Sequence, residues 1–206
     1  RPYHRAPHMY IGFPVRYLKR SWSDSMRALP ELEHKQWRAR DSLRYGTALT
    51  DSLIMFSRDG VTFKRWDESF LTPGIERPGT WNYGHQYLGW HLVETESKLP
   101  GAPRELSLYA LERYWHPFAG AHLRRYTLRL DGFVSAYAPW SGGELITKTL
   151  RFHGRKLTMN FSTSAAGGVR VEVQDANGRP IPGYTLEDCP PIYGDSIERT
   201  VTWEKN

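Results

Sequence analysis

The 206-residue sequence has a single cysteine and lacks long apolar segments. Cys189 has no second cysteine with which to form a disulfide within the chain, and a zinc site built from several cysteines is excluded. The longest apolar stretches, such as residues 52–56, have the length of a strand, whereas a membrane-spanning helix needs roughly 20 apolar residues. We therefore expect no membrane partner and a packed globular protein.

Motifs that bind cofactors or activate nucleophiles are also missing. The sequence has no G-x-S-x-G elbow for a catalytic serine and no G-x-x-x-x-G-K loop for phosphate. Of its eight histidines, His4 and His8 are four residues apart but lie in a proline-containing terminus, and His85 and His91 have no acidic partner at a metal-site spacing. No metal site and no cofactor is expected.

Positive charge is concentrated at the start of the chain. The formal net charge is +6; residues 1–50 hold ten Lys and Arg against four Asp and Glu, residues 51–140 ten of each, and residues 141–206 eight of each. Within residues 16–45 the cations are scattered among acids and aromatics, which is typical of a solvated loop or short helix. The alternative is a surface for nucleic acid or another polyanion, but nucleic acid is not the favoured partner.

The hydrophobic pattern favours an all-β fold, because almost no segment keeps a helical apolar period beyond two turns. The clearest element is a hairpin at residues 50–66, in which Asp59-Gly60 forms the turn. Pro14 is expected to bend the strand at residues 8–18, and one helical turn is expected in each of residues 25–30 and 31–37. Further strands are predicted at residues 87–95, 106–113, 122–130, 144–152, 156–162, 169–174 and 196–203.

Several segments together resemble a known family. These are MYIGFPVRY (9–17), TDSLIMFSRDGVTFKRW (50–66), TWNYGHQYLGWHLVET (80–95), LSLYALERYW (106–115) and LRRYTLRLDGFVSAYAPWSGGELITKTLRF (123–152). In this order they look like the closing blades of a five-bladed β-propeller glycoside hydrolase of the invertase and arabinanase type. The tail GGVRVEVQDANGRPIPGYTLEDCPPIYGD (167–195) is similar to the β-sandwich that follows the propeller in many bacterial members.

This resemblance implies two domains. Residues 1–140 would form a partial β-propeller of about two blades with a basic, loop-rich insertion at 19–49. Residues 141–206 would form a β-sandwich accessory domain, which we expect to be truncated. Two blades cannot close a propeller and leave sheet edges open. We therefore expect a fragment of a longer, secreted or periplasmic chain whose remaining blades are partners of these residues.

Such enzymes cleave glycosidic bonds with paired carboxylates, one protonating the leaving oxygen and the other activating water or attacking carbon. Three carboxylates in apolar strand context are candidates. Glu94 follows a strand beside aromatic and histidine residues and is the best candidate for the acid; its alternative is an exposed strand-end carboxylate. Asp51 begins a strand and is a base or a residue that tunes the acid, or else a turn cap. Glu112 alternates with Ala110, or pairs with Arg113 or Arg124 on a solvated face.

Sugar sites combine aromatic platforms with planar hydrogen-bonding groups. The predicted carbohydrate-binding residues are Arg16, Tyr17, Trp81, Tyr83, His85, Trp90 and Arg124. For each single aromatic residue the alternative is a place in the core. The sequence thus predicts a glycosidase that binds a carbohydrate ligand, with a non-catalytic carbohydrate-binding protein as the alternative.

Overall fold

The computed structural model describes residues 1–81, 86–89, 91–113 and 120–205. It is 30% strand and 9% helix, and its strand pairs are antiparallel, so the all-β prediction is confirmed at that level. A propeller and a sandwich stay predictions. The chain divides into two compact units, of which the first holds Arg1–Glu96 and Glu105–Leu128 and the second Ser97–Arg104 and Arg129–Asn206.

The first sheet of the first unit has the strand order β1-β2-β5-β6. Pro14 follows β2 and precedes β3, as predicted for a bent strand. The hairpin from β5 to β6 is confirmed by the pairing of Phe56 with Lys64. Its turn is held by Asp59, and Gly60 adopts a positive φ of 73°. The strands are β1 (Pro2–Tyr3), β2 (Ala6–Gly12), β5 (Met55–Ser57) and β6 (Lys64–Arg65).

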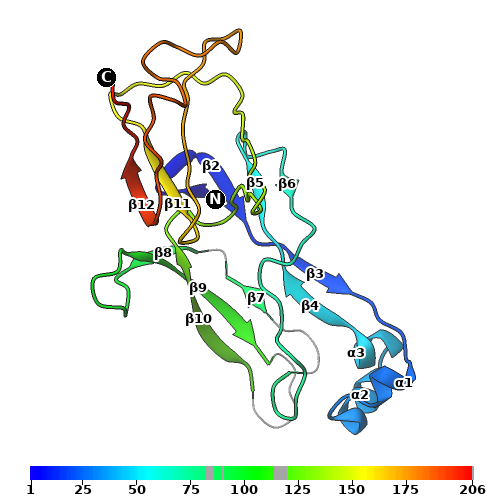
Figure 1. Cartoon of the computed structure of the whole chain (residues 1–206). Helices are drawn as coiled ribbons and strands as arrows, with labels where there is room; N and C mark the ends of the chain where they lie inside the picture. The colour runs from blue at the N-terminus through cyan, green and yellow to red at the C-terminus, as the bar shows by residue number, and fades with distance from the viewer. Residues whose placement is uncertain (82–85, 90, 114–119, 206) are drawn as a thin grey trace. The chain divides into compact units, whose positions relative to one another are not determined.

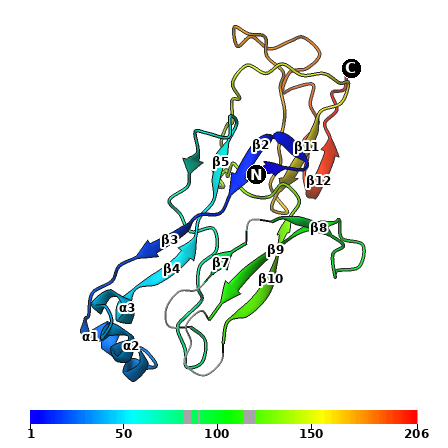
Figure 2. The ribbon, with the colours of Figure 1, turned by 180° about the vertical axis from the view of Figure 1, so that it is seen from behind.

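A second pair, β3 (Val15–Leu18) with β4 (Leu49–Ser52), leads into three short helices. Figures 1 and 2 both place the helices at the far end of this pair. Ser23 caps α1 by accepting a hydrogen bond from the Met26 amide at 3.1 Å. Two helices overlap the predicted helical turns, and the third was not predicted. They are α1 (Asp24–Arg27), α2 (Leu32–Ala39) and α3 (Leu43–Thr47).

A third sheet contains β7 (Tyr87–Leu88), β8 (Val93–Thr95), β9 (Glu105–Glu112) and β10 (His122–Arg129), in the order β10-β9-β7 with β8 also on β9. Alternate residues of a strand share a face, which explains why Leu108 and Ala110 are buried together with Leu88. Phe13, Phe70 and Tyr126 pack against this cluster. This apolar cluster of the first unit thus lies along one face of β9.

The second unit contains β11 (Thr158–Ser162) paired with β12 (Asp195–Thr200). Its apolar cluster consists of Cys189, Ile192, Val201 and Trp203. The turn at Asn177-Gly178 is present, because Gly178 has a φ of 76° and its amide donates to the Asp175 carbonyl. Among the predicted strands, residues 169–174 make only isolated bridges.

The strand predicted at residues 144–152 is absent from the structure, which has no regular secondary structure in this segment. Leu145, Ile146, Leu150 and Phe152 are all exposed. A strand requires a hydrogen-bonded neighbour as well as an alternating pattern. The pattern was present, but the described residues supply no partner strand for it.

Candidate functional site

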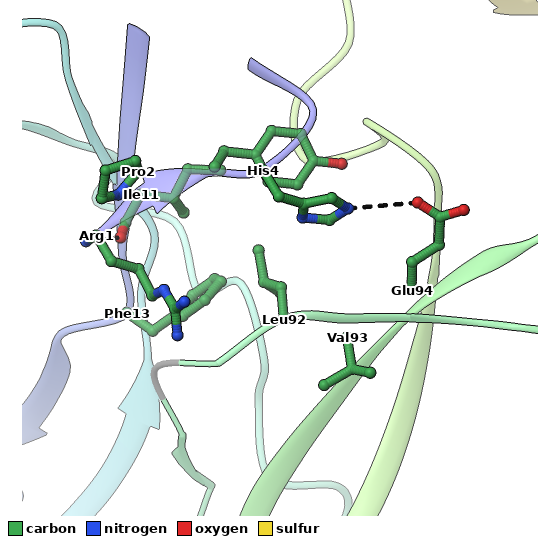
Figure 3. A pocket seen from close by; sticks show the side chains of 9 residues that line it. Arg1, Pro2, His4, Ile11, Phe13, Leu92, Val93 and Glu94 are labelled. Carbon is green, nitrogen blue, oxygen red and sulfur yellow. Dashed lines mark hydrogen bonds and ion pairs between the residues drawn. The ribbon is translucent and has the colours of Figure 1, made fainter. Parts of the chain in front are cut away.

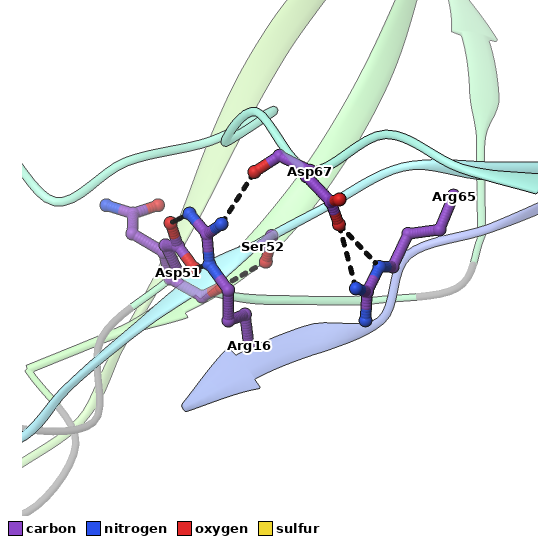
Figure 4. A network of polar contacts seen from close by, with 6 residues as sticks. Arg16, Asp51, Ser52, Arg65 and Asp67 are labelled. Atoms are coloured by element: carbon purple, nitrogen blue, oxygen red, sulfur yellow. Dashed lines mark hydrogen bonds and ion pairs between the residues drawn. The ribbon is translucent and has the colours of Figure 1, made fainter. Parts of the chain in front are cut away.

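Asp51 is buried in β4 and forms a two-point ion pair with Arg16 (Figure 4). The two residues lie directly opposite each other in the β3–β4 register. Arg16 Nε donates to Asp51 Oδ1 at 3.0 Å and Nη2 to Oδ2 at 2.6 Å, while Nη1 donates to the Asp67 carbonyl at 2.6 Å. The hydrogen bonds with Asp51 raise the pKa of Arg16. This fork fixes the position of the Asp51 carboxylate.

A cavity of about 330 Å³ lies beside Asp51 in the first unit, and we call it the Asp51 cavity. It brings two predicted site residues together, Asp51 and Trp81. Trp81 is 7% exposed, and its indole Nε1 donates to the Gly74 carbonyl at 2.9 Å, which fixes the ring. The lining residues are Arg20, Leu29, Leu49, Asp51, Thr72, Pro73, Glu76 and Trp81.

Glu76 contributes a second buried carboxylate to the Asp51 cavity, because its side chain is only 5% exposed. Its Oε1 accepts a hydrogen bond from Lys35 of α2, whose side chain is fully buried. Its Oε2 is buried and accepts no hydrogen bond from the described residues. Burial lowers the pKa of Lys35, and this effect exceeds the opposing one of Glu76. Glu76 thus keeps one oxygen for a ligand.

Arg20 also lines the Asp51 cavity. Its Nε donates to the Thr47 carbonyl at 2.6 Å, and the Thr47 hydroxyl donates back to the Arg20 carbonyl at 2.5 Å. Its Nη2 is buried and has no hydrogen-bond acceptor among the described residues. Burial lowers the pKa of Arg20, opposed by the charge of Glu76.

Glu112 is 5% exposed and lies at the end of β9, two residues after Ala110. Arg124 Nε donates to its Oε2 at 2.7 Å, and Gln86 Nε2 donates to its Oε1 at 3.2 Å. The Tyr126 hydroxyl also donates to Oε1, and burial together with this bond raises the pKa of Tyr126. The ion pair between Glu112 and Arg124, which the sequence offered as the alternative to a catalytic role, is present. Glu112 itself is buried, however, and does not lie on a solvated face. These contacts tie Glu112 into the sheet.

Glu94 lies in β8 beside another cavity, of about 290 Å³, in the same unit (Figure 3). His4 Nε2 points toward Glu94 and lies 3.3 Å from its Oε2, and Arg5 Nη1 lies 3.9 Å from the same oxygen. The Glu94 side chain is 26% exposed. The cavity is lined by Arg1, Pro2, Tyr3, His4, Ile11, Phe13, Leu92, Val93 and Glu94. An accessible carboxylate beside an imidazole is able to exchange protons with a ligand.

The other predicted binding residues are divided among several places. Tyr17 lies in β3 opposite Thr50, with the Arg44 guanidinium 5.6 Å from its ring centroid. Arg124 is bound to Glu112, and its side chain is 63% exposed. Tyr83, His85 and Trp90 lie outside the described residues.

Several cations of residues 16–45 have partners within the first unit. Lys35 and Arg38 are fully buried, and the guanidinium of Arg27 lies 5.1 Å from the Trp22 ring centroid. Arg44 lies over both Tyr17 and Tyr45. These cations and aromatic rings therefore contact groups of the same unit, whereas a polyanion surface would present them to a ligand.

Sequence reasoning missed Glu76, and it included Lys35 and Arg20 only in the basic segment 16–45 that it offered as an alternative polyanion surface. Glu76 lies in the segment Pro73-Gly-Ile-Glu-Arg-Pro-Gly79, which has the composition of exposed turns. Its burial depends on Lys35, 41 residues earlier in the chain. No local pattern could have indicated that contact.

Two further properties concern only the residues that the structure describes. Their His, Cys, Asp and Glu side chains form no group of three or more that could hold a metal ion. None of their helices is both long and apolar enough to cross a membrane.

Comparison of the chain with protein-family models, with curated proteins and with solved structures finds no match.

Proposed function

We propose that the chain is part of a β-propeller glycoside hydrolase that cleaves poly- or oligosaccharides with a pair of carboxylates. The observation that supports this proposal is the Asp51 cavity, in which two buried carboxylates and an indole line one space. Its volume of about 330 Å³ is near the lower end of the roughly 300–1,000 Å³ typical of ligand pockets. Most glycoside hydrolases cleave the sugar bond with a carboxylate pair, and an aromatic ring can pack on the apolar face of a sugar.

Each lining residue is suited to one role. Glu76, with one oxygen held by Lys35 and the other without a partner among the described residues, is the proposed acid. Its proton passes to the glycosidic oxygen as the bond from that oxygen to the anomeric carbon breaks. Asp51, held in place by Arg16, activates the water that attacks the anomeric carbon, or attacks that carbon itself. Trp81 offers its ring to the apolar face of the sugar.

Glu94 provides a second candidate for the acid, because its cavity also combines a carboxylate with aromatic residues. It differs from Glu76 in being one-quarter exposed and in contacting a histidine. Glu112 has a positioning role in the proposal, because Arg124, Gln86 and Tyr126 all bind its carboxylate.

The test is hydrolysis of a polysaccharide panel by the natural full-length protein, with release of reducing ends as the readout. Glu76→Gln and Asp51→Asn are each expected to lower kcat by at least about 100-fold, the usual contribution of an acid or base. Glu68→Gln and Asp41→Asn, which change exposed carboxylates, are matched controls that should keep full activity. Melting temperatures show whether each variant folds.

Other outcomes identify the alternatives. Loss of activity in Glu94→Gln but not in Glu76→Gln would move the acid to the cavity beside β8. Binding of a polysaccharide without hydrolysis, lost in Trp81→Ala and kept in Glu76→Gln, would identify a non-catalytic carbohydrate-binding protein.

A further inference from the structure

The Arg20 guanidinium is the unusual group of the Asp51 cavity, because it has a buried N–H donor with no acceptor among the described residues. A buried donor without an acceptor is costly, and the cost is larger when the donor carries charge. Arg20 forms no ion pair with a described residue, although its Nε is bound to the Thr47 carbonyl. One N–H of a fixed guanidinium is thus left for a ligand.

The charges around the Asp51 cavity favour an anion despite its two carboxylates. Asp51 is matched by the bidentate Arg16, and Glu76, even when it is ionised, is matched by Lys35. Arg20 adds a third cation to these two carboxylates, and the charge of Glu76 acts on it as well as on Lys35. The fully buried Arg38 lies close enough for its charge, like that of Arg20, to lower the pKa of Lys35. An anion in the cavity would meet an excess of positive charge.

We propose that the Asp51 cavity binds a sugar that carries an anionic group, a carboxylate or a sulfate ester, and that Arg20 is the residue that binds this group. The inference rests on the proposed function and specifies its substrate class. An oxyanion accepts the unused Nη2 hydrogen bond, while Trp81 packs on the sugar ring and Thr72 adds a hydroxyl to the lining. A neutral sugar gives the guanidinium no charged acceptor, so it binds more weakly.

The test is calorimetric titration of the natural full-length protein with matched sugars. Methyl glucuronide and methyl galacturonide carry a carboxylate, glucose 6-sulfate carries a sulfate ester, and methyl glucoside and methyl galactoside are neutral. At least one acidic sugar is expected to bind about tenfold or more tightly than its neutral counterpart, as a charge-assisted hydrogen bond allows. Carboxylate and sulfate are distinguished by which sugar shows this preference.

Arg20→Gln should remove the preference for the acidic sugar, and Arg20→Lys should retain part of it, because lysine keeps the charge but loses the fork. Arg40→Gln changes an exposed arginine that follows α2 and should bind like the wild type. The preference should also fall as salt concentration rises.

Equal affinity of the wild-type protein for acidic and neutral sugars would overturn the inference even if Arg20→Gln does not fold. The proposed hydrolase would survive that result if neutral polysaccharides are cleaved. An unchanged preference in a folded Arg20→Gln variant would also overturn it. Binding of inorganic sulfate through Arg20 without binding of any sugar would instead refute both the sugar ligand and the proposed hydrolase.

Discussion

Asp59 shows how an exposed residue can determine local structure. Its Oδ1 accepts hydrogen bonds from the amides of Val61 and Thr62 at 2.8 and 2.7 Å and from the Ser57 hydroxyl at 2.7 Å. The Val61 hydrogen bond is the largest cause that lowers the pKa of Asp59 far below its ordinary value. The carboxylate therefore stabilises the turn between β5 and β6 only while it is charged.

The Asp59 turn gives stability a pH dependence with a definite sign. Because the pKa is lower in the folded than in the unfolded state, the contribution is complete above the ordinary aspartate pKa of about 3.9 and is lost as pH falls below it. Asp59→Ala should lower the melting temperature at pH 6 and reduce its dependence on pH between about 4 and 2. Asp41→Ala, which removes an exposed aspartate, is the control. Parallel melting curves of Asp59→Ala and the wild type across this range would contradict the assignment.

Glu112 and Arg124 form one ion pair but should have unequal effects on stability. Glu112 is buried among three donors, whereas the Arg124 side chain is 63% exposed. Glu112→Ala leaves buried donors without an acceptor and should lower the free energy of unfolding by about 3 kcal/mol. Arg124→Ala should lower it by less than about 1 kcal/mol, because water can replace much of its contact. Chemical denaturation of both variants measures the difference, and equal losses would contradict it.

At the scale of single residues, the sequence placed Asp51 and Glu112 in predicted strands, and the structure has Asp51 in β4 and Glu112 in β9. The sequence offered Arg124 as a partner for Glu112, but it did not indicate Arg16 as the partner of Asp51, since that ion pair depends on the register of two strands. Glu76 was missed for a different reason, because its local sequence is that of a turn and its burial is a tertiary effect.

At the scale of elements, the contact between α2 and α3 depends on a glycine. A Cβ at Gly46 would lie 2.6 Å from the Trp22 ring and 2.7 Å from the Lys35 carbonyl oxygen. Both distances are too short for a carbon atom, and the second involves backbone that cannot move without α2. Gly46 thus allows the two helices to approach.

Gly46→Ala should therefore destabilise the helical segment. We expect a loss of about 1–3 kcal/mol in the free energy of unfolding, as for overpacked cores. Gly74→Ala is the matched control, because a Cβ at Gly74 has no heavy atom within 4 Å. Since Lys35 holds Glu76, Gly46→Ala should also weaken ligand binding in the Asp51 cavity. A stability equal to that of the wild type would show that α2 and α3 can separate without cost.

Elements that are determined by their own residues, such as a turn sequence or a proline, were predictable from the sequence. Elements that depend on pairing with distant residues were not. The hairpin of β5 and β6 follows from alternation and an Asp-Gly turn, and Pro14 separates β2 from β3 as expected. Residues 144–152 have the same alternation but remain unpaired. Helix α3 was missed because it contains Gly46 and Thr47, which are poor helix formers.

At the scale of the whole molecule, the two units have separate apolar clusters, one around Leu108 and the other around Trp203. Trp203 is 9% exposed, donates from its Nε1 to the Val171 carbonyl at 2.9 Å and packs edge-on against Tyr184. Its contacts therefore belong to the second unit.

Trp203→Ala should destabilise the second unit by about 3–5 kcal/mol. Hydrogen exchange followed by mass spectrometry should show faster exchange in β11 and β12, with β9 unchanged. Leu108→Ala is the reciprocal variant and should affect β9 alone. Faster exchange throughout the chain in either variant would mean that the units unfold together.

The only sulfhydryl of the chain, on Cys189, is 1% exposed and lies in the apolar cluster of the second unit. A thiol reagent can reach this sulfur only when that cluster opens, so its rate of reaction measures opening events of the second unit. Because the sequence has no other cysteine, the first unit adds no background to the measurement. The reaction rate of this natural thiol therefore reports local unfolding of the second unit without an introduced label.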